Sequence, residues 1–243
     1  MRLSVVIPAW NEAERLPRLL DSVDAARARW LAAGHAAADL EVIVADNGST
    51  DATREIALAR GCRVASVEKR AIAAARNGGA AIAQGEIVSF VDADSALHPD
   101  CLVAAIEAMS DRATLGGASG VTMERWSPGI AMTYALMLPM VWLTNFDTGL
   151  VFCRRVDFVA LGGYDESRLI AEDVDFLWRL RRLGRTRGQR LRRLRGVKGD
   201  TSTRKFDRYG DWHYFTQMPV ILWRLLRDGS INDFARRYWY EGR

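Results

Sequence analysis

Cysteine is scarce in this sequence. The 243 residues include only three, Cys62, Cys101 and Cys153, and they do not form a metal-binding motif with histidines. An odd number of widely spaced cysteines argues against a disulfide framework and against a zinc site. A reducing compartment, the cytoplasm, is the simplest expectation.

Two nucleotide-binding motifs are also missing. The first predicted strand is followed by Pro8-Ala9-Trp10-Asn11-Glu12 rather than a Gly-x-Gly-x-x-Gly turn, and no Walker-type Gly-Lys-Ser/Thr occurs. This excludes the dinucleotide fingerprint and the phosphate loop of NTPases. With 49% hydrophobic and 26% charged residues, the chain has the composition of an ordinary globular protein. Its length allows one large domain with a modest extension.

No convincing secretory signal opens the chain, because only a few apolar residues separate Arg2 from Pro8. Residues 126–146 are a harder case, since 21 uncharged residues could cross a bilayer. However, Pro128, Gly129, Pro139 and Asn145 interrupt the segment, and a crossing would separate two acidic motifs that we assign to one site below. We therefore predict that it does not span, and is either a buried helix or an apolar face resting on a membrane or a partner.

The N-terminal half alternates strand and helix signals. We expect strands over residues 3–7, 40–45, 64–67 and 86–91, with helices over about 16–31, 51–60 and 70–84 between them. Repeated βα units of this length predict an α/β fold, a mostly parallel Rossmann-like sheet with helices on both faces.

A pair of carboxylates stands where the last of these strands ends. Asp92-Ala93-Asp94 follows the apolar run Ile87 to Val91. Ligands of open α/β sheets collect at the carboxyl ends of strands, and residues i and i+2 of an extended segment point the same way. Carboxylates without nearby Cys or His suit Mg²⁺ or Mn²⁺, and that cation suits a diphosphate. The alternative is that one Asp caps the helix after Pro99 and the other is solvated.

Other polar groups follow the neighbouring strands. Asp46 ends the second strand, before an Asn47-Gly48 turn, and Arg76 with Asn77 interrupts a helix otherwise built from small apolar residues. A turn and cap for Asp46, and a surface position for Arg76, are the alternatives left open.

Six motifs in order resemble the family-2 glycosyltransferases of the GT-A fold. The resemblance covers about residues 3–183 and rests on Pro8-Ala9-Trp10-Asn11-Glu12, Asp46-Asn47-Gly48-Ser49-Thr50-Asp51, Ala75-Arg76-Asn77-x-Gly79, Asp92-Ala-Asp94, Gly162-Gly163-Tyr164-Asp165 and Glu172-Asp173-Val174-Asp175. It implies that Pro8, Ala9, Glu12 and Ala93 line the donor nucleotide, Asp46 reads the base, and Arg76 contacts base or phosphate. Asp92 would approach the ribose. Asp94 would hold the metal, with Asp92 close to that metal.

The resemblance also assigns a catalytic group. Asp173, at the start of a helix expected over about 172–183, is implied to be the general base that takes a proton from the attacking acceptor hydroxyl. Acidic residues in a first helical turn also suit the helix dipole, which is the structural alternative. Gly149, Glu172 and Arg204 are predicted on the acceptor side. The implied donor is a UDP- or GDP-sugar, since Asn47 replaces an aspartate often found there, and inversion is implied by family membership.

Positive charge gathers at the end of the chain. Residues 1–180 hold 17 Lys and Arg against 24 Asp and Glu, while residues 181–243 hold 17 against 6. Processive relatives carry Gln-x-x-Arg-Trp, and Gln189-Arg190-Leu191-Arg192-Arg193 lacks the Trp, so we expect one sugar per acceptor. The basic segment predicts a phosphate-bearing or lipid-linked acceptor at an anionic membrane surface, unless these arginines pair with the acidic excess upstream.

The expected organisation is a glycosyltransferase domain over 1–198, with a nucleotide-sugar half over about 1–115 and an acceptor half over 116–198. A basic helical extension over 199–243, rich in Trp and Tyr, packs on the domain or faces a membrane. The expected location is the cytoplasm, with peripheral attachment to the inner face of the membrane as the alternative.

Two other functions fit part of the pattern. A sugar-nucleotide pyrophosphorylase would use a similar α/β domain but is expected to carry a Gly-rich loop where Pro8-Ala9-Trp10 stands. A basic module for RNA or anionic membrane would explain the charge, yet no aromatic stacking motif for RNA is evident, so nucleic acid is not an expected partner.

Overall fold

The structure of this protein is a computed structural model. It describes residues 1–144, 146–168 and 171–216, without the side chain of residue 140. Seven strands form one sheet in the order β3-β2-β1-β4-β6-β5-β7. They are β1 (Leu3–Ala9), β2 (Leu40–Asp46), β3 (Arg63–Ser66), β4 (Ile87–Phe90), β5 (Thr114–Met123), β6 (Val151–Arg154) and β7 (Arg190–Thr201). Only β6 among them runs antiparallel to its neighbours. The predicted α/β fold with a mostly parallel sheet is confirmed.

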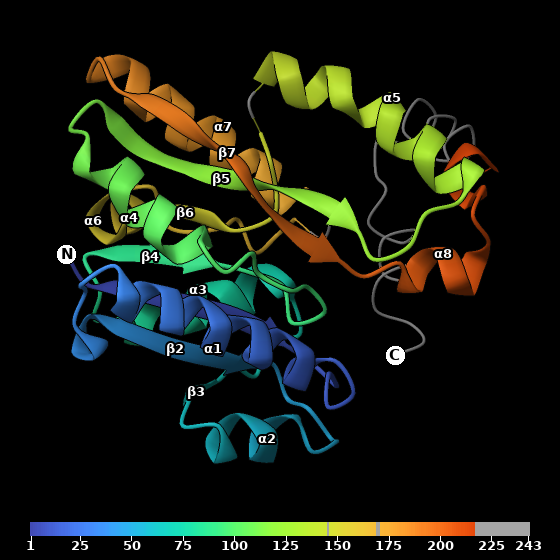
Figure 1. The fold of residues 1–243 in the computed structure, drawn as a ribbon, viewed down its shortest axis with the longest axis horizontal. Coiled ribbons are helices and arrows are strands. Elements are labelled where there is room, and N and C mark those ends of the chain that lie inside the picture. The colour runs from blue at the N-terminus through green and yellow to red at the C-terminus, as the bar shows by residue number, and fades with distance from the viewer. Residues whose placement is uncertain (145, 169–170, 217–243) are drawn as a thin grey trace.

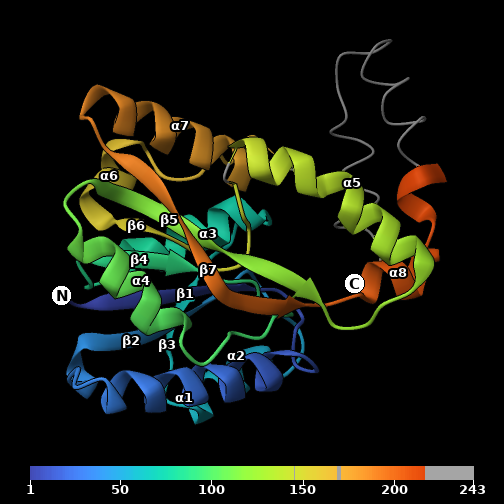
Figure 2. The same ribbon diagram turned by 45° about the horizontal axis from the view of Figure 1, so that its top comes forward.

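Helices cover both faces of the sheet (Figure 1). They are α1 (Leu16–Ala32), α2 (Thr53–Ala59), α3 (Ile72–Ile82), α4 (Cys101–Ser110), α5 (Pro128–Thr144), α6 (Arg155–Ala160), α7 (Glu172–Thr186) and α8 (Arg204–Tyr209), with a 3₁₀ turn at Ala37–Asp39. Figure 2 shows α1 and α7 on opposite sides of the sheet. The three-layer arrangement places the carboxyl ends of β1, β2 and β4 at one common edge.

Alternation along β1 divides the core in two. Val5 and Ile7 face a cluster built with α1 and α4, while Val6 faces the cluster built with α3, α6 and α7. The helix α3 lies so close to this second face that a Cβ on Gly79 would stand 2.4 Å from Cγ1 of Val6. The glycine of the Arg76-Asn77-x-Gly79 motif is therefore a contact point between helix and sheet.

Within residues 126–146 the chain forms α5, and four of its large apolar side chains are exposed. Trp142 and Leu143 are 72% and 82% exposed, and Met132 and Leu136 are also open to solvent. Among the described residues no helix, α5 included, is long and apolar enough to cross a bilayer. The alternative of a buried helix is wrong, because only the side of α5 with Ile130 packs inward.

The basic segment after α7 forms a strand that runs past the predicted end of the domain. Residues 190–201 form β7, an edge strand paired with β5 except at residues 195–197, where the register shifts. The boundary predicted at residue 198 therefore falls inside the sheet, which continues to Thr201. The sequence concealed this because four arginines and a lysine interrupt the apolar pattern of the strand, and an edge strand tolerates such residues on its open side. The Trp- and Tyr-rich tail beyond residue 216 lies outside the described residues.

Candidate active site

A pocket of about 230 Å³ opens at the carboxyl edge of the sheet. Its walls come from the segments after β1 and β4, the ends of β5 and β7, and the region of α8, and the lining residues are Pro8, Glu12, Ile72, Asp92, Ala93, Asp94, Met123, Thr201, Ser202, Lys205, Phe206 and Tyr214. Five residues predicted to bind the donor thus line one pocket. We call it the donor pocket.

Asp92 and Asp94 face this pocket, and each is bound by a different arginine. Arg76 Nη2 lies 2.8 Å from Asp92 Oδ1, and Arg204 Nη2 lies 3.2 Å from Asp94 Oδ2. Neither aspartate caps α4, whose first turn follows Asp100. The capping alternative for this motif is therefore wrong.

Glu12 is placed by the loops after β1 and β2. Its backbone N–H donates to Thr53 Oγ1 at 2.8 Å, and Asn11, which has a positive φ of 53°, accepts the N–H of Thr50 at 2.8 Å. These bonds fix the turn that carries the Glu12 carboxylate, which is 3% exposed, into the donor pocket.

Arg76 is buried between two carboxylates. Its Nη1 lies 2.5 Å from Glu172 Oε1, so a residue of α7 is tied through α3 to Asp92 at the end of β4. Burial lowers the pKa of the guanidinium, but the charges of Asp92 and Glu172 outweigh it and raise that pKa well above its ordinary value. Burial also raises the pKa of Glu172, against the attraction of Arg76. The surface position left open for Arg76 is wrong.

Arg204, predicted on the acceptor side, contacts two carboxylates that were predicted to bind the donor. Its Nη2 lies 3.0 Å from Glu12 Oε1 as well as 3.2 Å from Asp94. The two carboxylates belong to the set predicted to bind the donor. Arg204 therefore joins α8 to the donor pocket, a contact across 192 and 110 residues that no local sequence pattern reveals.

The acidic groups of the donor pocket suit a divalent cation by their chemistry. No three His, Cys, Asp or Glu side chains are grouped as a complete metal site in the part of the chain that the structure describes. Mg²⁺ and Mn²⁺ prefer oxygen ligands, and Mg²⁺ commonly uses one or two carboxylates with the phosphates of a substrate. Asp92 and Asp94 fit that pattern, with the substrate completing the coordination.

Asp46 and Asn47 stand at the end of β2, beside the end of β1. Asp46 accepts the N–H of Ser49 at 3.0 Å, and Asn47 donates to the carbonyls of Val67 and Lys69 at 3.0 and 2.7 Å. Both side chains therefore organise loops. For Asp46 this agrees with the alternative that it stabilises a turn. Asp46 and Ala9 are outside the lining of the donor pocket, and Ala9 packs in the core.

Asp173 begins α7 next to the buried Glu172. It is partly exposed, and the preceding Ala171 has a positive φ of 56°, which turns the chain sharply into the helix. Beneath it, the ring of Tyr164 packs 5.1 Å from the Arg76 guanidinium. Burial raises the pKa of the Tyr164 hydroxyl well above its usual range, so that group stays protonated. The predicted base thus stands beside the Arg76 network.

Gly149 has a clear packing role. A Cβ there would lie 2.6 Å from Ser119 Oγ and 2.8 Å from the carbonyl oxygen of Gly120. The glycine allows the chain to enter β6 against β5. Its predicted place on the acceptor side stays a prediction.

Sequence reasoning missed the wall of the donor pocket that follows β7. Lys205, Phe206 and Tyr214 line it, together with Thr201 and Ser202. A signal existed in Ser202-Thr203-Arg204-Lys205-Phe206, a polar turn with two cations after a strand. We assigned it to an extension because the preceding arginines hid the strand.

The family model described as "Glycosyl transferase family 2" matches residues 4–151. The chain belongs to glycosyl transferase family 2. The match contains the segments after β1, β2 and β4 that form the donor side of the site. It favours the glycosyltransferase hypothesis over the pyrophosphorylase and over the basic binding module.

Two curated relatives share part of the sequence. Glycosyltransferase AglE of Haloferax volcanii is 32% identical over 114 residues, which are 44% of this chain and 35% of that protein. Dolichyl-phosphate beta-glucosyltransferase of Drosophila melanogaster is 38% identical over 104 residues, 40% of this chain and 32% of that protein. The matched segments span about a third of the length of these relatives.

Two solved glycosyltransferase structures share the fold. TarS of S. aureus, residues 1–349 in complex with UDP-GlcNAc, gives a TM-score of 0.65 at 18% identity and covers 99% of this chain and 71% of that chain. The mannosyltransferase PcManGT of Pyrobaculum calidifontis, in complex with GDP-Man and Mn²⁺, gives 0.62 at 21% identity and covers 82% and 56%. At these identities the likeness concerns the fold.

Proposed function

We propose that this family-2 glycosyltransferase moves one sugar from a nucleotide-diphospho-sugar to a hydroxyl or phosphate acceptor. The observation that carries the proposal is the convergence of Glu12, Asp92 and Asp94 on one pocket at the carboxyl edge of the sheet. The carboxyl edge of a parallel sheet is a common binding site for nucleotides. Paired carboxylates at that edge can hold a divalent cation, and the cation can bind a diphosphate. TarS with UDP-GlcNAc and PcManGT with GDP-Man support a UDP- or GDP-sugar as the donor.

Asp94, with Asp92 beside it, would hold Mg²⁺ or Mn²⁺ against the diphosphate. When bound, the cation supplies positive charge that offsets the charge developing on the leaving nucleoside diphosphate. PcManGT with Mn²⁺ supports this use of a divalent metal. The side chains of Pro8 and Ala93 complete the wall that the nucleotide would contact.

Asp173 is the proposed base. Its carboxylate accepts the proton of the acceptor hydroxyl as that oxygen attacks the anomeric carbon, while the bond from this carbon to the diphosphate oxygen breaks. A single displacement of this kind inverts the configuration at the anomeric carbon. Arg76 and Glu172 position the start of α7 next to the end of β4, which brings acceptor-side and donor-side groups together.

The acceptor is proposed to be lipid-linked or to carry phosphate, presented at an anionic membrane surface. The exposed face of α5 lies near a basic groove, because Trp142 lines a pocket together with Arg193, Arg195 and Lys198. Some of the predicted basic cluster is neutralised, since Arg193 pairs with Asp147 and Arg187 with Asp157. Arg185, Arg192 and Arg195 form no ion pair with any carboxylate in the described ranges, and all three are exposed.

A thermal-shift panel tests the function without knowledge of the acceptor. UDP, GDP, ADP and their sugars are each tested with Mn²⁺ and with chelator. A ligand that binds only the folded state increases the free energy of unfolding, by roughly 2.7 kcal/mol at a hundredfold excess over its dissociation constant, and so raises the melting temperature. We expect one of the uridine or guanosine series to stabilise the protein, only with metal. No shift with any nucleotide would contradict the proposal.

A further inference from the structure

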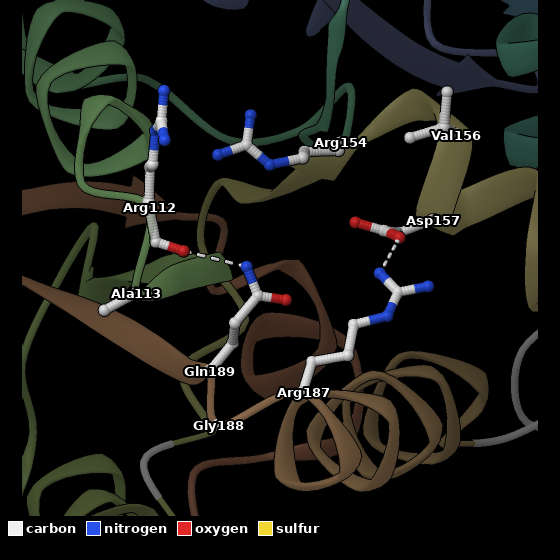
Figure 3. Close-up of a pocket in the computed structure, with 8 residues that line it drawn as sticks. All are labelled: Arg112, Ala113, Arg154, Val156, Asp157, Arg187, Gly188 and Gln189. Carbon is white, nitrogen blue, oxygen red and sulfur yellow. Dashed lines mark hydrogen bonds and ion pairs between the residues drawn. The ribbon is translucent and has the colours of Figure 1, made fainter.

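A second pocket, of about 600 Å³, opens at the opposite edge of the sheet from the donor pocket. It is lined by Arg112, Ala113, Arg154, Val156, Asp157, Arg187, Gly188 and Gln189, shown in Figure 3. These residues come from the turn before β5, the end of β6 with the start of α6, and the turn between α7 and β7. Ala113 precedes β5 and Met123, in the donor pocket, ends it, so the two pockets are about 30 Å apart at roughly 3.3 Å per residue.

Two of the three arginines in this pocket have no counter-ion among the residues that the structure describes. Arg187 Nη1 lies 2.5 Å from Asp157 Oδ1, which neutralises it. Arg154 donates only to the carbonyl of Met109, at 3.1 Å, and the Arg112 guanidinium makes no hydrogen bond or ion pair within the described ranges. Figure 3 shows the guanidinium groups of Arg112 and Arg154 on the same side of the pocket. Two positive charges on the same side of a pocket, neither of them paired with a carboxylate among the described residues, favour an anion between them.

The same pocket holds acceptors without donors. Asp157 is 3% exposed and its Oδ2 has no hydrogen-bond partner, and Gln189 Oε1 is likewise buried without one. The amide of Gln189 is oriented, because its Nε2 donates to the carbonyl of Arg112 at 2.8 Å. Figure 3 shows both oxygens turned toward the middle of the pocket. A buried acceptor without a donor is unfavourable, so hydroxyl groups of a ligand would stabilise this arrangement.

We propose that this pocket is a second binding site, for a phosphate monoester on a hydroxylated ring, such as a sugar phosphate. Arg112 and Arg154 bind the phosphate oxygens, and Asp157 and Gln189 accept hydrogen bonds from ring hydroxyls. The site is independent of the proposed transfer reaction, since it shares no residue with the donor pocket. Two sources carry this chemistry, a soluble sugar phosphate and the headgroup of a phosphoinositide.

Ligand-detected NMR on the whole chain, with chelator present, tests the proposal. The probes are inorganic phosphate, glucose 6-phosphate and glucose. We expect glucose 6-phosphate to bind more tightly than phosphate, and glucose not to bind measurably. Arg112→Gln should weaken binding of glucose 6-phosphate roughly tenfold, as expected for loss of a charge-assisted hydrogen bond.

Arg112→Gln is the informative variant because its guanidinium supports nothing else, so the fold is expected to be unchanged. Arg182→Gln is the matched control, since Arg182 is an exposed arginine of α7 outside this pocket. Equal binding by wild type and Arg112→Gln would overturn the site. Equal affinity for phosphate and glucose 6-phosphate would overturn the recognition of the ring.

Sedimentation with vesicles separates the two sources. Vesicles containing phosphatidylinositol 4-phosphate are compared with vesicles of equal charge containing phosphatidylserine. Retention by the first alone, lost in Arg112→Gln, assigns the site to a lipid headgroup, whereas binding of soluble glucose 6-phosphate without such retention assigns it to a soluble metabolite. Failure of both would contradict the proposal.

Discussion

Two arginines hold the acidic groups of the donor pocket from different sides. Arg76 is buried and joins Asp92 to Glu172, whereas Arg204 is 29% exposed at its side chain and joins Asp94 to Glu12. A buried pair that loses one partner leaves an uncompensated charge, so Arg76 is structural as well as close to the proposed base. Arg204 can move to solvent more easily. Arg204 is paired with Asp94, the carboxylate that is proposed to hold the cation.

This difference predicts the effect of Arg204→Gln. The variant frees Asp94 and Glu12 from a positive neighbour, so Mn²⁺ should bind more tightly in the absence of nucleotide, by roughly threefold to tenfold. Calorimetry with Mn²⁺ alone measures it. Lys205→Gln is the control, since it removes the same charge from the same pocket wall. An equal gain in both variants would show general electrostatics rather than displacement of Arg204 from Asp94.

A second prediction at this scale concerns Asp173. Asp173→Asn keeps the shape of the side chain and removes its ability to take a proton, so turnover should fall about a hundredfold or more with donor binding unchanged. Asp175→Asn is the matched control, because Asp175 lies on the same helix turn and pairs with Arg179 at 2.7 Å. Normal turnover by Asp173→Asn together with an inactive Asp175→Asn would identify Asp175 as the base and refute the assignment to Asp173.

At the scale of elements, α3 packs tightly against the sheet, whereas α5 exposes one side to solvent. The close packing of α3 on β1 requires Gly79, and Arg76 projects from that same helix. Gly79→Ala should therefore destabilise the protein by about 1–3 kcal/mol despite the better helix propensity of alanine. Denaturant unfolding measures the loss as a lower midpoint at unchanged slope. An unchanged or raised midpoint would contradict the tight contact.

Helix α5 is anchored at its ends and open along its side. Arg125, just before it, pairs with Asp207 and Asp211, and Arg181 of α7 donates to the carbonyl of Thr144. Between these anchors four of its apolar side chains are exposed, and Trp142 among them lies beside the basic groove. An exposed apolar face next to cations is the pattern of a surface that rests on anionic lipid.

Flotation with vesicles tests this interpretation of α5. Liposomes with anionic lipid should retain the protein at low salt and release it as salt increases. Trp142→Ser with Leu143→Ser should reduce retention without lowering the melting temperature, because both side chains are largely exposed. Leu58→Ser, on the exposed side of α2, is the control. No retention at low salt would leave α5 without a membrane role.

At the scale of the whole molecule, the sequence predicted what local patterns determine. The strands β1, β2 and β4 were found because apolar runs end at turn residues, and the carboxyl-edge placement of Asp92 and Asp94 follows from parallel pairing alone. The strand β7 was missed, because its arginines break the apolar pattern and only pairing with β5 reveals it. The contacts of Arg76 and Arg204 join segments 16 to 192 residues apart, which no local pattern encodes.

The most direct test of the account is a calorimetric titration with UDP and with GDP, for wild type and Asp94→Asn, each with Mn²⁺ and with chelator. We predict that wild type binds one of the two nucleotides with Mn²⁺ and loses at least tenfold in affinity with chelator. Asp94→Asn should bind weakly in both conditions while melting like wild type. Equal affinity in Asp94→Asn and wild type, or binding indifferent to chelator, would contradict a donor site built around a cation at Asp94.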